Sequence, residues 1–263
     1  PSSRCGFATA SPSSQAFFKE VPDNKSTSFR VATINVDGCG ALPYRNTTPA
    51  SRMKQLVQII LPLDPDAILF QEVTDELFEA LRGLLPAWGT FRKESGREHY
   101  YVVTFTKEKA RKGGIESKSK SFQGYSEQGR HMLVVRYGPL TLMNVHAESG
   151  DKNSAGRNRR AQLEQMAAFT HDAAEDDSPC ILAGDFNMRN EPVREENIIL
   201  NAGWKDGGDV CKIVIPGCES LEGWTWKRGM TKKNYDRIFL WSKDGSAAHF
   251  TRAGVLEQNV WNK

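Results

Sequence analysis

The sequence has no apolar run long enough to cross a membrane and no cysteine pattern typical of a disulfide framework or a zinc site. Its 5 cysteines are odd in number and form no C-x-x-C pair, so we expect a reducing, intracellular compartment, nuclear or cytoplasmic. Glycine and proline, 22 and 12 of 263 residues, are too few for a low-complexity or collagen-like protein. A large charge excess is also lacking: a net charge of +3 permits a polyanionic partner without requiring one.

Several well-known catalytic signatures are absent as well. The sequence contains no G-x-x-x-x-G-K-[ST] phosphate loop, no G-x-G-x-x-G motif, no G-x-S-x-G nucleophile elbow and no H-E-x-x-H zinc motif. These absences argue against the nucleotide-binding, serine-hydrolase and zinc-protease classes that the motifs mark.

The first residues differ in composition from the rest of the chain. Residues 1–15 are rich in Ser, Ala and Pro and contain no acidic residue. We expect residues 1–28 to be a disordered leader, with the remnant of an organelle transit segment as the alternative. Folded sequence begins near Phe29, and we expect residues 29–263 to form a single domain.

Apolar runs and amphipathic stretches alternate along this domain, and they predict strands and helices respectively. Strands are expected at 29–36, 67–72, 100–105, 132–137, 140–146, 180–185, 223–227, 235–241 and 247–252. Helices are expected from residue 48, at 75–85, at 157–174 with Arg159 on its exposed start, and at 193–200. Because hairpins are frequent, an α/β architecture of two packed mixed sheets flanked by helices is favoured over a purely parallel sheet.

Polar side chains recur where the apolar strands end. The first two strands end at Asn35 and Glu72, and two later strands end at His146 and Asp185. Ligands tend to bind beyond strand ends, where a rigid backbone fixes short polar side chains. Taken singly, Asp185 is typical of a turn, and Asn35 and His146 are typical of hydrogen-bonded structural residues. Glu72 differs, because it interrupts an apolar strand and needs a partner such as a cation.

These residue types indicate a particular chemistry. Oxygen ligands without a cysteine or histidine cluster favour Mg²⁺ or Mn²⁺ over zinc, and Mg²⁺ keeps waters and leaves room for a phosphate. Asp185 and Asn187 are suited to hold and deprotonate a water, while His146 donates to phosphate oxygens. The residue types alone therefore predict a metal-assisted phosphodiester hydrolase.

Five motifs occur in a fixed order along the chain. They are T-I-N-V-D-G at Asn35, F-Q-E-V at Glu72, N-V-H-A-E-S at His146, G-D-F-N at Asp185 and Y-D-R-I-F at Asp236. This order resembles the DNase I-like endonuclease/exonuclease/phosphatase superfamily over about residues 29–253. The resemblance implies a four-layer α/β/β/α sandwich of two mixed sheets flanked by helices.

Within the superfamily, the stretches H-A-E-S, G-D-F-N-M-R and T-W are similar to those of the 5′-tyrosyl-DNA phosphodiesterases. This likeness implies removal of a tyrosyl adduct from a DNA 5′ end, leaving a 5′-phosphate. Ser149, Arg189 and Trp226 match positions that contact substrate in that branch. We expect a monomer whose partner is a nucleic-acid 5′ end, in particular protein-linked DNA.

The resemblance also implies roles for the residues at the strand ends. Glu72 is the expected main ligand of Mg²⁺, or of Mn²⁺, with Asn35 beside the metal and the scissile phosphate. Asp185 orients or deprotonates the attacking water, Asn187 holds that water or the phosphate, and His146 donates to the charge that develops on the phosphorane.

One motif of the superfamily does not occur in this sequence. The S-D-H motif, whose His is central to catalysis, is missing, and Asp236 matches the residue that orients that His. We favour truncation at the C-terminus over natural loss, and expect this chain to be inactive or weakly active. Two rivals stay open: a less selective endonuclease, exonuclease or phosphatase of the superfamily, and a non-catalytic nucleic-acid-binding module.

Overall fold

The computed structural model describes residues 28–38, 48–94, 101–107, 115–122, 124–138, 140–173, 178–189, 194–207, 226–228, 231–233 and 235–243. The expected leader lies outside the described residues except for Ser28, and the strand expected at 247–252 lies outside them entirely. Among the helices in the described ranges, none combines the length and the apolarity that a membrane span requires.

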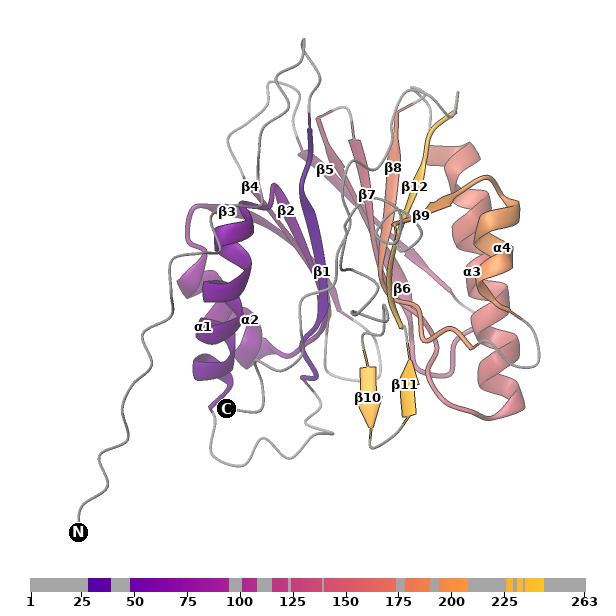
Figure 1. The fold of residues 1–263 in the computed structure, drawn as a ribbon, viewed down its shortest axis with the longest axis horizontal. Coiled ribbons are helices and arrows are strands. Elements are labelled where there is room, and N and C mark those ends of the chain that lie inside the picture. Colours follow the sequence, from indigo (N-terminus) through magenta and orange to yellow (C-terminus); the bar gives the residue numbers. More distant parts are fainter. Residues whose placement is uncertain are drawn as a thin grey trace.

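The first sheet has four strands in the order β1-β2-β4-β3, with β1 and β2 parallel and the other pairs antiparallel. Its strands are β1 (Val31–Asn35), β2 (Ala67–Val73), β3 (Trp88–Glu94) and β4 (Tyr101–Lys107). Helices α1 (Pro49–Ile60) and α2 (Asp75–Leu84) cover its outer face, and the short 3₁₀ helix η2 (Leu61–Leu63) follows α1 (Figure 1).

Helix α1 begins where the sequence predicts. The Thr48 hydroxyl accepts a hydrogen bond from the Ser51 N–H, and Pro49 occupies the first turn, where its missing N–H costs nothing. Met53, Leu56 and Ile60 recur at helical spacing and are buried against the sheet, which fixes the face that the helix presents.

The second sheet has six strands in the order β5-β6-β7-β8-β12-β9, with β7 and β8 parallel and the other pairs antiparallel. Its strands are β5 (Ile115–Ser121), β6 (His131–Tyr137), β7 (Leu140–His146), β8 (Cys180–Asp185), β9 (Lys205–Asp206) and β12 (Asp236–Trp241). Helices α3 (Asn153–Ala173) and α4 (Glu196–Asn201) cover its outer face. β10 (Trp226–Arg228) and β11 (Thr231–Lys233) pair antiparallel in a separate two-stranded sheet.

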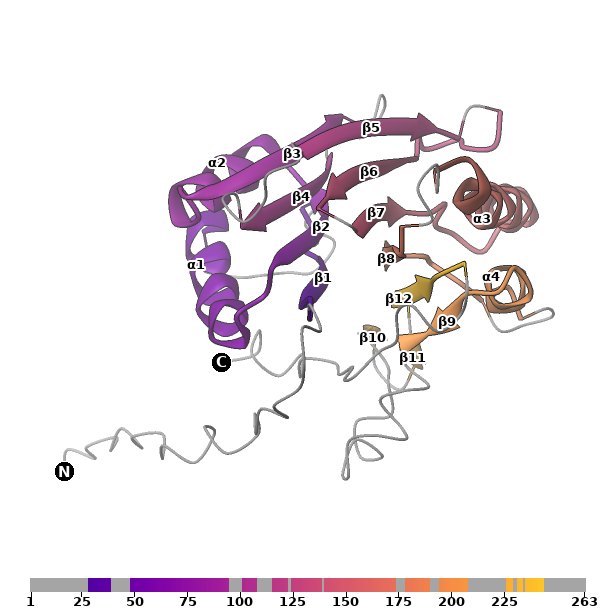
Figure 2. The same cartoon turned by 90° about the horizontal axis from the view of Figure 1, so that it is seen from above.

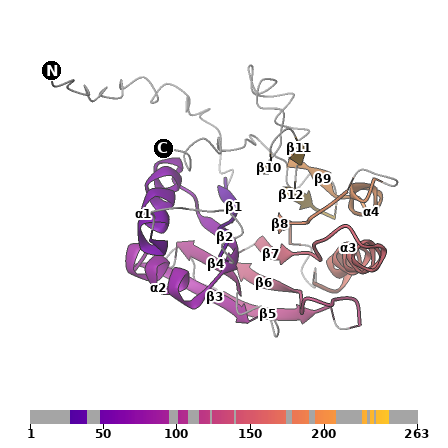
Figure 3. The same ribbon diagram turned by 90° about the horizontal axis from the view of Figure 1, so that it is seen from below.

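The two sheets pack face to face between the two helical layers, as the view from above shows (Figure 2). One apolar cluster, which includes Leu69, Leu142 and Ala183, fills the space between the sheets. A second apolar cluster lies between the first sheet and helices α1 and α2, and a third lies between the second sheet and helices α3 and α4. From below, β1 and β8 face each other across the interface between the sheets (Figure 3). The four-layer α/β/β/α sandwich expected from the sequence is thus confirmed.

A pair of buried amides crosses this apolar interface. Gln71 Nε2 donates to Asn144 Oδ1 at 2.8 Å, and Asn144 Nδ2 donates to the carbonyl oxygens of Phe70 at 3.2 Å and Val103 at 3.0 Å. Both amide side chains are fully buried. Because Gln71 precedes Glu72, this contact fixes the end of β2 against the second sheet.

Candidate active site

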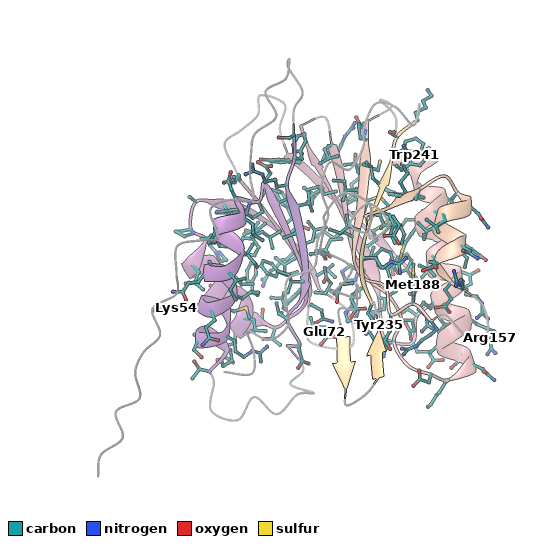
Figure 4. The ribbon with its side chains drawn as sticks, in the orientation of Figure 1. Lys54, Glu72, Arg157, Met188, Tyr235 and Trp241 are labelled. Atoms are coloured by element: carbon teal, nitrogen blue, oxygen red, sulfur yellow. The ribbon has the colours of Figure 1, made fainter. Side chains whose placement is uncertain are left out.

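The carboxyl ends of two parallel strand pairs bring four predicted residues together. Asn35 ends β1, Glu72 lies near the end of β2, and His146 and Asp185 end β7 and β8. Asn35 Nδ2 donates to Glu72 Oε1 at 2.9 Å and to Asp185 Oδ2 at 2.8 Å, so one amide joins the two sheets. Glu72 and Tyr235, the residue before β12, are labelled at this end of the sheets (Figure 4).

The backbone at Glu72 is irregular. Its φ of +57° lies in a region that residues other than glycine seldom occupy, and the pairing of β2 with β4 shifts between Phe70 and Val73. Gly38 packs closely here, since a Cβ at that position would lie 1.9 Å from the Glu72 carbonyl oxygen. Such strain persists where the surroundings over-determine the conformation, and here it accompanies a carboxylate that faces Asn35.

His146 is held as a neutral hydrogen-bond donor. Arg130 Nη1 lies 2.8 Å from His146 Nδ1, and because a guanidinium has only donors, Nδ1 accepts and the ring proton resides on Nε2. Burial, and then the charge of Arg130, lowers the pKa of His146 well below its ordinary value. Nε2 lies 3.6 Å from Glu72 Oε1 and 3.8 Å from Asp185 Oδ2, so its N–H faces both carboxylates.

The two carboxylates are poorly compensated by their surroundings. Burial raises the pKa of Glu72 from 4.5 to about 7, opposed in part by the hydrogen bond from Asn35. Burial also raises the pKa of Asp185, opposed by hydrogen bonds from Asn35 and from the Asn187 N–H. A neutral amide shared by two desolvated carboxylates does not balance two negative charges. A divalent cation would balance them, so the residues fit a metal site.

The atoms that face this site define what it could bind. A carboxylate oxygen of Glu72, one of Asp185 and a ring nitrogen of His146 all lie within 4.8 Å of one another. Because Nε2 carries the ring proton, His146 is placed to donate rather than to ligate a metal. Asn35 directs Oδ1 to the Asp37 N–H at 2.9 Å, so its amide oxygen faces away from the carboxylates. The oxygen atoms that face the site are carboxylate oxygens of Glu72 and Asp185, which suit Mg²⁺ or Mn²⁺. Glu72 as the metal ligand with Asn35 beside the metal stays a prediction.

Asn187 completes the turn after β8 in a left-handed conformation, with φ of +49°. Its backbone N–H donates to Asp185 Oδ1 at 2.9 Å, and its Nδ2 donates to the Ala147 carbonyl oxygen at 3.2 Å. With Asn35 bonded to the other oxygen, each oxygen of Asp185 accepts one of these hydrogen bonds and keeps capacity for another donor such as water.

The predicted substrate contacts lie on loops beside this cluster. Ser149 follows β7 and contacts the Gln128 amide through both its N–H and its hydroxyl. Arg189 follows β8, with Nη2 at 3.1 Å from Asp151 Oδ1 and its guanidinium carbon 4.8 Å from the ring centre of Tyr235. These contacts fix the two side chains; they do not test substrate binding.

A buried ion pair connects the two loops, and the sequence does not predict it. Arg159 Nε donates to Glu195 Oε2 at 2.6 Å, and Arg159 Nη1 donates to the Glu148 carbonyl oxygen at 3.0 Å. Glu195 Oε2 also accepts from the Arg189 N–H at 2.8 Å. The expectation that Arg159 is exposed is wrong, since the residue is 2% exposed. Its partner lies 36 residues away, on a loop whose packing no local pattern reveals.

Asp236 and Trp226, the two remaining predicted residues, belong to strands near the end of the chain. Asp236 opens β12 directly opposite Asp185 in the antiparallel pairing, which brings it to the same end of the second sheet. Trp226 contributes backbone to β10, and its side chain lies outside the described part of the structure.

A family model for the endonuclease/exonuclease/phosphatase family matches residues 32–240, most of the chain. The chain belongs to this family. Its motif order, the two sheets and the polar strand ends are therefore those of an endonuclease/exonuclease/phosphatase protein, and membership places the chain among phosphoester hydrolases.

The individual proteins that resemble this chain have low sequence identity to it. A 5′-tyrosyl-DNA phosphodiesterase from Caenorhabditis briggsae is 26% identical over 273 residues, covering 94% of this chain and 70% of the relative. A crystal structure of TDP2 from Caenorhabditis elegans matches with a TM-score of 0.63 and 21% identity, over 81% of this chain and 64% of that longer chain. TDP2 from D. rerio, solved with a single-strand DNA product, matches with a TM-score of 0.59 and 20% identity, over 81% and 84%. The structural matches confirm the fold, and the sequence match confirms the likeness to a 5′-tyrosyl-DNA phosphodiesterase.

Proposed function

We propose that this chain is a Mg²⁺-dependent phosphodiesterase that hydrolyses 5′-phosphotyrosyl–DNA linkages and leaves a 5′-phosphate. The observation that carries the proposal is the cluster of Asn35, Glu72, His146 and Asp185 where the two sheets meet. The likeness to a 5′-tyrosyl-DNA phosphodiesterase supports the choice of substrate.

In the proposed reaction, a water oxygen attacks phosphorus while the bond from phosphorus to the tyrosine oxygen breaks. Asp185 accepts the water proton, and the departing tyrosine oxygen takes up a proton from solvent. Burial raises the pKa of Asp185, which makes its carboxylate a stronger base than an exposed one. Asn187, fixed by its bonds to Asp185 and Ala147, holds the water or the phosphate.

The remaining groups are proposed to stabilise the negative charge that develops on the phosphoryl oxygens. Glu72, with Asn35 beside it, would hold a Mg²⁺ ion, which when bound would supply positive charge that stabilises the phosphoryl oxygens. His146 presents an Nε2–H whose direction Arg130 has already set, so it donates to a phosphoryl oxygen without reorganising. Ser149, Arg189 and Trp226 are the proposed contacts to the DNA 5′ end, and Asp236 is proposed to orient a neighbouring catalytic group.

The test is an assay with a 5′-phosphotyrosyl oligonucleotide, an unmodified oligonucleotide, and Mg²⁺ or a chelator. We expect weak release of a 5′-phosphate product by this chain, from the tyrosyl substrate alone and only with metal, and at least about a hundredfold less product with Glu72→Gln. Comparison with any longer natural form of the protein shows whether product release rises when further sequence is present. Cleavage of the unmodified strand, with the tyrosyl substrate intact, would favour the less selective nuclease instead.

A non-catalytic nucleic-acid-binding module is the second candidate, because the S-D-H motif does not occur in this sequence. Such a module would bind single-stranded DNA equally well with and without Mg²⁺. It would release no tyrosine from the substrate in either form of the chain. Binding measured by fluorescence anisotropy, next to the cleavage assay, separates the two candidates.

A further inference from the structure

A loop outside the strand ends, residues 124–130 between β5 and β6, packs against the segment that follows β7. The Ser126 hydroxyl donates to Glu148 Oε2 at 2.7 Å, and the Glu127 N–H donates to Glu148 Oε1 at 3.1 Å. The Ser126 oxygen in turn accepts from the Arg130 N–H at 2.8 Å. Glu148 is 2% exposed, so these bonds fix the loop in a buried setting.

The amide of Gln128 in this loop has its orientation set by donors. Its Oε1 accepts from Arg130 Nε at 3.1 Å, from Arg130 Nη2 at 2.9 Å and from the Ser149 N–H at 2.9 Å. A flipped amide would turn its NH₂ group toward these three N–H groups, none of which can accept. The amide nitrogen of Gln128 therefore faces the Ser149 hydroxyl, 2.9 Å away.

This orientation determines what the Ser149 hydroxyl can do. An amide oxygen has two lone pairs, and Gln128 Oε1 already receives three N–H donors, so a fourth donor 3.1 Å away is disfavoured. The hydroxyl oxygen accepts from Gln128 Nε2 instead. The O–H of Ser149 is then available to donate to a further acceptor, such as a phosphate oxygen.

The same amide reaches His146 through Arg130. The Arg130 guanidinium donates to Gln128 Oε1 through Nε and Nη2, and its Nη1 lies 2.8 Å from His146 Nδ1. Arg130 is 3% exposed, so its direction depends on the partners that hold it. Without the Gln128 oxygen, this buried fork would lose two of its hydrogen bonds, and with them part of what holds its direction.

We propose that Gln128 is a positioning residue of this site, which sets the direction of the Ser149 O–H and, through Arg130, keeps the proton of His146 on Nε2. It thereby aligns two neutral donors that the sequence places on one motif, His146 and Ser149. That these donors serve a phosphoryl group rests on the proposed function; the control of their geometry does not.

The geometric part is tested by NMR on protein labelled with ¹⁵N-histidine, whose long-range spectra report which ring nitrogen carries the proton. We expect the Nε2–H form in the wild type and in Gln128→Glu, which keeps an oxygen facing Arg130. Gln128→Met removes that oxygen and shifts His146 to a mixture of forms. Gln165→Met, a partly exposed position on α3, is the matched control and leaves the spectrum unchanged. An unchanged His146 signal in Gln128→Met overturns the inference.

The catalytic part is tested by steady-state kinetics on the tyrosyl substrate. We expect Gln128→Met to lower kcat by about 10- to 100-fold with KM changed less than about threefold, because ground-state contacts remain. Gln128→Glu keeps the His146 tautomer but loses Nε2, so Ser149→Ala should have no further effect in that background. An additive loss in the double variant would overturn the role toward Ser149. If the wild type hydrolyses nothing while the tautomer shift occurs, the proposed function fails and the positioning of His146 stands.

Discussion

Asn35 is the residue through which the Glu72 and Asp185 carboxylates, on different sheets, share one contact. Its amide nitrogen donates to both, while its amide oxygen accepts from the Asp37 N–H. A neutral donor between two carboxylates keeps them near each other without cancelling their charge, which leaves the site receptive to a cation.

Replacing this donor with an acid tests that account. Asn35→Asp removes the shared N–H groups and adds a third carboxylate, so we expect the free energy of unfolding to fall by about 1–3 kcal/mol in a chelator. Saturating Mg²⁺ should restore part of the loss. Urea unfolding with chelator and with Mg²⁺ measures both effects, and equal stability of wild type and variant in the chelator would contradict this role for Asn35.

The thiol of Cys180, fully buried at the start of β8, gives a second expectation for a single residue. Burial raises the pKa of Cys180 from 9.0 to about 11, so at pH 8 the thiolate population is about a hundredfold smaller than in an exposed thiol. Alkylation by iodoacetamide should be slower in the folded protein than in urea by at least about that factor. Peptide mass spectrometry follows Cys180 alone, and equal rates in both states would refute the expectation.

Single residues of the site differ in how far the sequence reveals them. Glu72 is predictable because a carboxylate inside an apolar strand has no structural explanation without a partner. Gln128 and Arg130 lie in a polar turn where such residues are ordinary. Their contacts to Ser149 and His146 span 21 and 16 residues, so only the packing of β6 beside β7 reveals them.

Among the elements, the sequence predicts the central strands of both sheets and misses β3, β5 and the short strands β9 and β11. Of these, β3, β5 and β9 lie at the edge of a sheet, as the strand orders show. In β5 the run Ser-Lys-Ser-Lys-Ser carries side chains that are mostly exposed, and edge pairing through the backbone leaves little apolar pattern to detect. Strands buried on both faces, such as β2 and β7, carry continuous apolar runs that the sequence identifies directly.

The parallel contact of β7 with β8 depends on Gly184. This residue has φ of +147°, and a Cβ added there would lie 2.0 Å from the Val145 carbonyl oxygen. We expect Gly184→Ala to destabilise the protein by about 3 kcal/mol or more, since both the backbone conformation and the strand spacing oppose it. Gly83→Ala in α2 is the matched control, because a Cβ there meets nothing within 4 Å. It should be neutral or stabilising by up to about 1 kcal/mol in the same urea titration.

In the whole molecule, the two sheets are joined by apolar packing and by the buried amides of Gln71 and Asn144. The apolar part follows from the sequence pattern of the strands. The amide contact does not, because it needs the relative placement of β2 and β7, which the sequence pattern does not specify.

This amide contact should contribute measurably to the free energy of unfolding. Asn144→Ala removes one acceptor of the Gln71 amide and a donor to each of the Phe70 and Val103 carbonyl oxygens, three buried hydrogen bonds in all, so we expect the free energy of unfolding to fall by about 2–4 kcal/mol. The exposed Asn197 on α4 provides the control, with Asn197→Ala expected to change stability by less than about 0.5 kcal/mol. Guanidinium unfolding measures both. Similar small effects in the two variants would show that apolar packing alone holds the sheets together.

The hydrogen bond from Asn35 to Asp185 connects residues 150 positions apart in the chain. Contacts of such long range form late in folding, because the chain loses the entropy of closing a large loop before it gains the favourable energy of the contact. During synthesis the strands of the first sheet leave the ribosome well before β7 and β8. Glu72 is therefore present before its partners His146 and Asp185. The four-residue cluster is therefore completed late in the life of each nascent chain, and a folding intermediate that holds only the first sheet lacks two of its members, His146 and Asp185.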